Sequence, residues 1–128
     1  MAREKNNMAK YLVKSTKTGF NFALVASNGE TVCTSEVYST KRSCLNGVAS
    51  VAKNAPVAAV ENQTKEGFAK EKLPKFEVYK DKKGEFRFRL KAKNGQNICA
   101  SEGYTTEKAC LNGVKSVAKN AGSKVEEK

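Results

Sequence analysis

A twelve-residue segment occurs twice in this chain of 128 residues, and this repetition constrains the possible folds more than any other feature of the sequence. Residues 44–55 and 110–121 are identical except that Ala49 in the first copy is replaced by Lys115 in the second. Before each copy the same signals occur in the same order: an Asn-Gly pair, a Ser-Glu pair and a tyrosine. The chain is therefore predicted to be a tandem duplication of one structural unit.

The pattern of each unit predicts three antiparallel strands followed by one helix. Apolar and charged residues alternate along 86–91, as expected for a half-buried strand, and Asn94-Gly95 is a strong hairpin signal. A hydroxyl-bearing pair before each repeated segment supplies N-cap chemistry, so we expect helices over 41–54 and 107–120. The candidates for a short fourth strand are residues 57–60 and, if Val125 repeats the role of Val60, the C-terminal tail.

A three-stranded meander with one helix leaves one face of its sheet open. A second copy can cover what one copy leaves open. We therefore predict an α+β fold with pseudo-twofold symmetry, in which repeats at 10–61 and 75–126 form one compact domain with a composite core. The polar residues 62–74 are the predicted linker. This arrangement is the covalent counterpart of a homodimer, so we expect the chain to be a monomer.

The order of motifs in the second unit resembles that of a known family. The motifs are Phe-Arg-Phe-Arg-Leu-Lys-Ala at 86–92, Asn94-Gly95, Ser-Glu-Gly-Tyr at 101–104, Leu-Asn-Gly at 111–113 and Lys-Asn-Ala at 119–121. In this order they closely resemble the YegP-like bacterial family. The resemblance covers both units, and it implies one or two copies of the β-β-β-α unit and an uncharacterised function. The first unit departs from the pattern, because Asn21 and Ala23 stand where the second unit has two arginines.

The net charge of +11 is the strongest compositional signal. It suits an anionic partner such as nucleic acid, although lysines that are mixed with glutamates along the chain also fit an ordinary solvated surface. No apolar run approaches the roughly 20 residues of a membrane span, and the first residues lack the apolar region of a signal peptide. We therefore expect no membrane association and a cytoplasmic location.

Four cysteines, Cys33, Cys44, Cys99 and Cys110, occur in a chain without histidine. Their spacing lacks the short Cys-x-x-Cys pairs of zinc sites. Two disulfides are conceivable, but a chain without a secretory signal favours free, half-buried thiols. Isolated carboxylates without a histidine or a second carboxylate make a poor catalytic set, and no phosphate-binding glycine loop is present. We expect no metal, no cofactor and no enzymatic activity.

The two repeated helices share two features, a glycine in the middle of the helix and a pair of residues on the solvent side. Each carries a mid-helix glycine, Gly47 or Gly113, although glycine costs about 1 kcal/mol relative to alanine at such a position. We expect these glycines to pack closely against a helix or loop across the pseudo-twofold axis. The first candidate binding surface lies opposite the core, where packing does not require the identities that both copies retain. Its residues are Asn46, Lys53, Asn112 and Lys119.

A basic ribbon in the second unit is the other candidate surface. Arg87, Arg89, Lys91 and Lys93 alternate with apolar residues and should project from one face of the sheet. Such a ribbon could follow a phosphate backbone, but it lacks the aromatics that stack on bases in single-strand binders. The arginines could instead pair with Glu85 or Glu102. The sequence therefore favours a non-catalytic module that binds an unknown protein or small ligand; the alternative is a nucleic-acid-binding protein that uses the ribbon.

Overall fold

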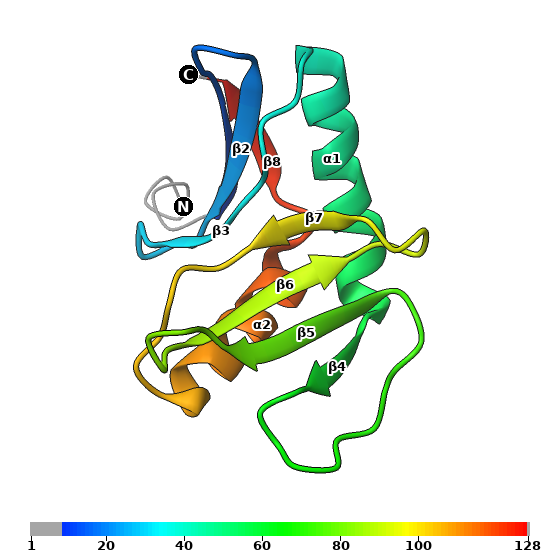
Figure 1. Ribbon diagram of the computed structural model, residues 1–128. Coiled ribbons are helices and arrows are strands. Elements are labelled where there is room, and N and C mark those ends of the chain that lie inside the picture. Colours follow the sequence, from blue (N-terminus) through cyan, green and yellow to red (C-terminus); the bar gives the residue numbers. More distant parts are fainter. Residues whose placement is uncertain (1–8, 128) are drawn as a thin grey trace.

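Two helices lie on one face of a strongly twisted sheet in the computed structural model, which describes residues 9–127 (Figure 1). The first repeat contributes β1 (Lys10–Ser15), β2 (Phe20–Val25), β3 (Thr31–Thr34), α1 (Lys41–Asn54), a 3-10 turn at Ala55–Val57 and β4 (Ala59–Asn62). The second repeat contributes β5 (Lys75–Lys80), β6 (Phe86–Lys91), β7 (Asn97–Ala100), α2 (Glu107–Asn120) and β8 (Lys124–Glu127). Both helices have the predicted bounds, and both repeats have a fourth strand.

The eight strands follow the order β4-β5-β6-β7-β3-β2-β1-β8 across one sheet. The two antiparallel meanders join edge to edge at β3 and β7, where Thr34 pairs with Ala100. Each fourth strand then leaves its own repeat, because β4 pairs in parallel with β5 and β8 pairs in parallel with β1. The α+β tandem duplication is confirmed, and the structure adds an exchange of strands that locks the two repeats together.

The second copy does not cover the open face of the first, contrary to the expectation from the sequence. It extends the sheet instead, so that α1 packs on β2, β1 and β7 while α2 packs on β6, β5 and β3. Because both helices lie on the same face, the apolar residues of both repeats form one continuous cluster beneath them. The opposite face of the sheet carries no helix within residues 9–127.

The centre of this core is built from matching residues of the two repeats. Phe22 and Phe88 are fully buried in the second strand of their repeats, and each meets an aromatic ring of the neighbouring strand edge-on at 5.8 and 6.0 Å respectively. One of these neighbours, Tyr11, donates a hydrogen bond of 2.6 Å from its buried hydroxyl to the carbonyl of Ala121. This bond ties the first strand of the chain to the segment between α2 and β8.

The N-caps agree with the expectation from the sequence, and the thiols are free as expected but fully buried instead of half-buried. Thr40 and Thr106 accept hydrogen bonds through Oγ1 from the backbone amides three residues ahead, at 3.0 and 3.1 Å. All four cysteines are buried and free. Burial raises the pKa of the Cys44 thiol and raises that of Cys110 to about 11.

Each mid-helix glycine faces the tyrosine that precedes its own helix. A Cβ atom on Gly113 would lie 2.6 Å from Oη of Tyr104 and 2.9 Å from Cε2 of Phe88, and these two rings stack with centroids 6.4 Å apart. Gly47 makes the same close approach to Tyr38 in the first repeat. The predicted tight contact is therefore present, but the predicted partner across the pseudo-twofold axis is wrong, because the contact lies within one repeat.

Candidate functional site

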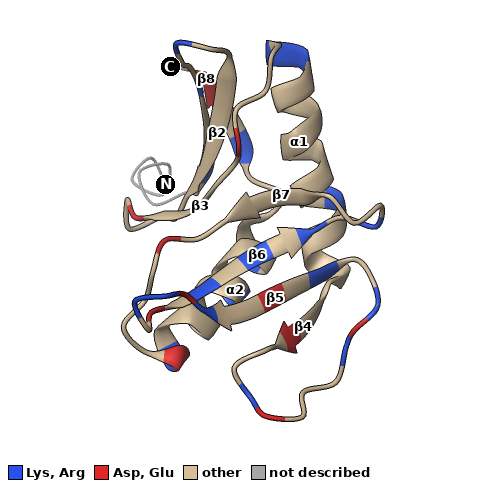
Figure 2. Cartoon of the chain, in the orientation of Figure 1, with Lys and Arg blue, Asp and Glu red and all other residues tan. Residues whose placement is uncertain are grey.

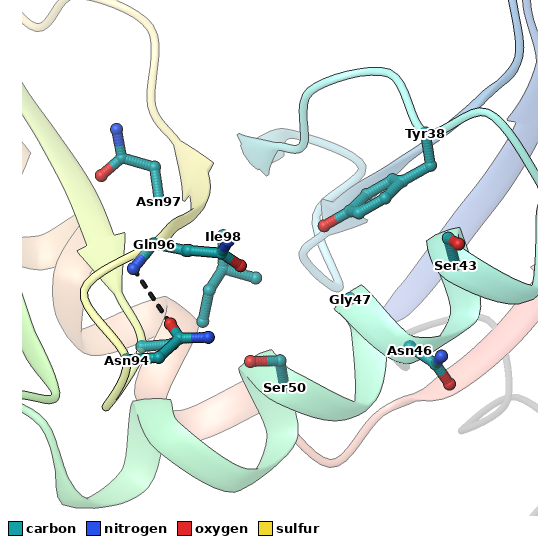
Figure 3. Close-up of a pocket in the computed structure, with 10 residues that line it drawn as sticks. Tyr38, Ser43, Asn46, Gly47, Ser50, Asn94, Gln96, Asn97 and Ile98 are labelled. Atoms are coloured by element: carbon teal, nitrogen blue, oxygen red, sulfur yellow. Dashed lines mark hydrogen bonds between the residues drawn. The ribbon is translucent and has the colours of Figure 1, made fainter.

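A groove runs between α1 and the hairpin that connects β6 to β7. It consists of three adjoining hollows of about 180, 380 and 370 Å³. The first two share Asn46, Ser50 and Asn94, so they are continuous with each other. The first and third share Tyr38 and the end of the hairpin. We call this feature the helix–hairpin groove, and each of its walls comes from a different repeat (Figure 3).

The helix wall presents side chains from one stripe of α1. Asn46, Ser50 and Lys53 are spaced four and three residues apart, which places them on the same side of the helix. Asn54 is buried behind them and donates from Nδ2 to the Ser50 carbonyl at 2.8 Å and to Ser50 Oγ at 3.1 Å. Gly47 leaves the space in which the Tyr38 ring reaches the groove. The wall is therefore fixed from behind.

The hairpin wall is held by its own turn. Gly95 has φ = 86°, a conformation that favours glycine. Asn94 Oδ1 accepts a hydrogen bond of 3.0 Å from the backbone amide of Gln96. The carbonyl of Gln96 accepts one of 2.9 Å from the backbone amide of Ala92. This turn positions the residues that line the groove from the hairpin side: Lys93, Asn94, Gln96 and Asn97.

The groove combines carboxamides with positive charge. Lys53 and Lys93 line the largest hollow from opposite walls, and neither forms an ion pair with another side chain of residues 9–127. No acidic residue lines this hollow or the smallest one, whereas Glu36 borders the third. Carboxamides both donate and accept hydrogen bonds. The groove therefore offers a polar ligand directional contacts in its middle and attraction for an anion at one end.

The structure divides the first candidate surface into two patches. Asn46 and Lys53 lie in the helix–hairpin groove, where they meet Lys93 from the candidate ribbon. Asn112 and Lys119 are exposed on α2, which contacts β3 as α1 contacts β7. Sequence reasoning missed the hairpin carboxamides, because the only signal there, Asn-Gly, was interpreted as a turn.

The other ribbon residues are committed to ion pairs on the outer face of the sheet. Arg87 Nε donates to Asp81 at 2.6 Å, and Arg89 Nε donates to Glu77 at 2.6 Å. Lys91 lies 3.8 Å from the same Glu77 carboxylate. Lys93 lies beyond the end of β6, in the hairpin turn. The expected pairing of the arginines is present, but the partners expected from the sequence, Glu85 and Glu102, are wrong. Figure 2 shows the basic and acidic segments interleaved along these strands.

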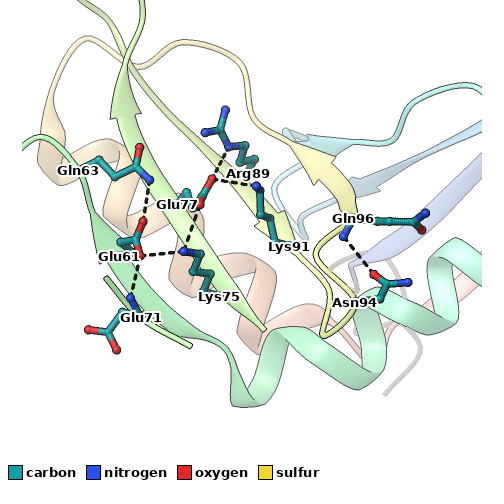
Figure 4. A network of polar contacts seen from close by, with 9 residues as sticks. All are labelled: Glu61, Gln63, Glu71, Lys75, Glu77, Arg89, Lys91, Asn94 and Gln96. Atoms are coloured by element: carbon teal, nitrogen blue, oxygen red, sulfur yellow. Dashed lines mark hydrogen bonds and ion pairs between the residues drawn. The ribbon is translucent and has the colours of Figure 1, made fainter. Parts of the chain in front are cut away.

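A buried ionic network holds β4 against the second repeat (Figure 4). Lys75 Nζ lies 2.8 Å from Glu61 and 3.3 Å from Glu77, and both carboxylates are buried. Glu61 also accepts hydrogen bonds of 2.7 Å from Gln63 Nε2 and from the Glu71 amide. The bond from Lys75 is the main cause that lowers the pKa of Glu61 to about 2. The network satisfies its own charges, so we assign it to the fold and not to a ligand.

Neither a metal centre nor a membrane helix is found in the described chain. Residues 9–127 contain no group of three histidine, cysteine, aspartate or glutamate side chains arranged to hold a metal ion. None of their helices is long and apolar enough to cross a membrane.

These features define a class of protein: a strand-exchanged tandem repeat of β-β-β-α units with a groove between one helix and a hairpin of the other repeat. The model of a domain of unknown function, DUF1508, matches the sequence twice, at residues 15–62 and 81–127. The chain belongs to this family.

Relatives match over almost the whole chain. The chain is similar to the UPF0339 protein YegP of Yersinia pestis, with 40% identity over 119 residues that span 92% of this chain and 93% of that protein. Its fold is similar to the solution structure of yegP from E. coli, a protein of unknown function, with a TM-score of 0.74 at 32% identity, covering 94% and 92% of the two chains. The YegP-like resemblance is therefore confirmed.

The family extends beyond bacteria and beyond tandem repeats. A UPF0339 protein of the archaeon Methanosarcina acetivorans is 53% identical over 49 residues, which span 38% of this chain and 84% of that one. That relative is thus little longer than one repeat. The description of the family as bacterial is too narrow, and its name assigns no function.

Proposed function

We propose that this chain is a non-catalytic binding module whose ligand site is the helix–hairpin groove. The observation that carries the proposal is the meeting of Asn46 and Lys53, which the repeats retain without a packing reason, with Lys93 and the carboxamides of the opposite hairpin. A concave polar site with few, fixed hydrogen-bonding groups is typical of small-ligand recognition. The largest hollow, about 380 Å³, is within the size range of such sites.

The proposal also accounts for the residues that recur in both repeats. Asn112 and Lys119 occupy on α2 the positions of Asn46 and Lys53 on α1, and Asn28 occupies in the β2–β3 hairpin the position of Asn94. Each helix contacts the third strand of the other repeat, α1 with β7 and α2 with β3. The helix–hairpin groove is therefore assembled from two repeats, and the same residue types recur where α2 contacts β3. A binding role explains why these exposed residues are kept.

Binding is favoured over catalysis by the chemistry of the groove. Its titratable groups are the two lysines, the Tyr38 hydroxyl, whose pKa is raised by burial, and Glu36 at the far end. The chain has no histidine, and no second carboxylate joins Glu36 in the linings. A general acid–base pair or an activated nucleophile needs a second titratable group of this kind, a histidine or another carboxylate, close by.

The test is a two-dimensional ¹H–¹⁵N NMR screen of the full chain against sugars, nucleosides, amino acids and their phosphorylated forms. We expect a binding compound to shift the amide signals of Asn46, Ser50 and Asn94. Ala49 is exposed and lines the largest hollow, so Ala49→Trp should block it without removing a hydrogen bond. Lys115→Trp, at the matching position of α2, is the control and should leave these shifts intact. The proposal fails if no compound shifts the groove, or if both variants bind alike.

A further inference from the structure

We propose, building on the binding role above, that the ligand of the helix–hairpin groove is a small phosphate monoester with a hydroxyl-bearing body, and that the matching position, where α2 contacts β3, does not bind it. The largest hollow of the groove contains two cations. Lys53 and Lys93 line it from opposite walls, with no acidic residue in its lining. A phosphate monoester carries about −1.5 to −2 charges at pH 7, so two ammonium groups suit it better than they suit a single carboxylate.

Neither of these two charges takes part in an ion pair that stabilises the fold of residues 9–127. Cations on the outer face of the second repeat are paired: Lys75 with Glu61 and Glu77, and Arg89 with Glu77. Within the described chain, Lys53 and Lys93 have no such partner. An anion that enters between them therefore does not have to displace an internal carboxylate.

The polar groups follow a definite order along the groove. The lysines line the largest hollow, and Asn46 and Asn94 border both this hollow and the smaller one. Tyr38 lines the smaller one at its other end, across from the hairpin residues (Figure 3). The Tyr38 hydroxyl forms no hydrogen bond to residues 9–127. A molecule with a phosphate at one end and hydroxyl groups along its body complements this order, because carboxamides and a phenol can each donate to and accept from hydroxyl groups.

The matching position beside α2 differs in the charge of its hairpin. Ser27 stands where the other hairpin has Lys93, and Glu30 stands where it has Gln96. The pKa of the Tyr104 hydroxyl is raised by burial first, and the Glu30 carboxylate is among the charges that raise it further. The helix side keeps Lys119 and gains Lys115, but the hairpin supplies a carboxylate in place of a cation. We therefore expect one phosphate site in each chain and not two.

The test is an NMR titration of the full chain with inorganic phosphate, glucose 6-phosphate and uridine monophosphate, each monoester paired with glucose or uridine. Glucuronate tests whether a carboxylate suffices. We expect at least one monoester to bind with a stoichiometry of one, about tenfold or more tighter than its neutral counterpart and tighter than glucuronate. Lys53→Gln and Lys93→Gln should each weaken binding by about three- to tenfold, and added salt should weaken it further.

The hairpins provide a matched pair of charge variants. Gln96→Glu gives the groove the carboxylate of its counterpart and should weaken monoester binding by about tenfold, whereas Glu30→Gln should leave the first site unchanged. The inference is overturned if no phosphate probe shifts the groove signals at about 10 mM, or if neutral compounds or glucuronate bind as tightly. In those cases binding of neutral compounds would still support the proposed function. A groove that takes no compound of any charge would overturn both.

Discussion

Replacing Gly113 by alanine tests whether α2 is built around the ring of Tyr104. In the middle of a helix this substitution normally stabilises by about 1 kcal/mol, because alanine has the higher helix propensity. Here the new Cβ would lie 2.6 Å from Tyr104 Oη and 2.9 Å from Phe88 Cε2. The ring of Tyr104 is stacked on the ring of Phe88 with an interplanar angle of 16°, so neither ring can move away freely.

Overpacking of this kind typically costs about 1–3 kcal/mol. After the gain in helix propensity is subtracted, we expect Gly113→Ala to lower the free energy of unfolding by about 0–2 kcal/mol instead of raising it. Tyr104→Phe removes the nearest atom but leaves Phe88 in place. The double variant should therefore recover part of the loss, with a coupling energy of about 1 kcal/mol.

Urea denaturation of the two single variants and the double variant measures these quantities. Gly122→Ala is the matched control, because no atom lies within 4 Å of a Cβ built there. This control should be neutral or slightly stabilising. If Gly113→Ala stabilises the protein by about 1 kcal/mol and shows no coupling to Tyr104, the helix is not held off by the tyrosine and the reasoning is refuted.

Four further predictions follow from other contacts. Tyr11→Phe should lower the free energy of unfolding, measured by urea denaturation, by about 1–2 kcal/mol, because it leaves the buried carbonyl of Ala121 without its hydrogen bond. Tyr38→Phe should change this free energy little, because the Tyr38 hydroxyl has no hydrogen-bond partner in residues 9–127. The Glu61 carboxyl has a pKa lowered to about 2, so its stabilising effect is complete above its ordinary pKa and is lost as the pH falls from about 4.5 towards 2; Glu61→Gln should flatten this part of the stability profile. An aromatic disulfide reagent should titrate all four thiols in denaturant and few in the native protein, and equal native and denatured counts would contradict their burial. Because Arg87 and Arg89 are paired, generic DNA and RNA should bind no tighter than about 0.1 mM near physiological salt, and tighter binding that Arg87→Gln and Arg89→Gln abolish would restore the ribbon hypothesis.

Local signals in the sequence predicted the elements better than their partners. The helices begin after Thr40 and Thr106 because each threonine side chain accepts a hydrogen bond from the backbone amide three residues later. Such a short-range contact can be predicted from the local sequence. The exchange of fourth strands has no such signal. Val60 pairs with Phe76 of the other repeat, and nothing in its own segment distinguishes that edge from any other. The sequence therefore predicted the fold class but not the pairing between strands of different repeats.

The candidate site shows the same division. Asn46 and Lys53 were chosen as candidates because both repeats have the same residues at these solvent-facing positions, and these residues do line a groove. The opposite wall was missed because its position depends on how the repeats join at β3 and β7. The ion-pair partners of the arginines were assigned wrongly for a related reason: Glu77 faces Arg89 through the register of β5 and β6, which the sequence alone did not fix.

The strand-exchanged architecture gives a reason for keeping two copies in one chain. A helix of one repeat and a hairpin of the other form the helix–hairpin groove, so one repeat by itself supplies only half of it. A relative little longer than one repeat, such as that of Methanosarcina acetivorans, would need a second copy of itself to build the same groove, and its two hairpins would then be identical. Duplication removes this constraint. In the tandem chain, Gln96 and Glu30 differ at matching positions while both hairpins keep their Asn-Gly turn, so one hairpin can change its charge without altering the turn that shapes it or the other hairpin.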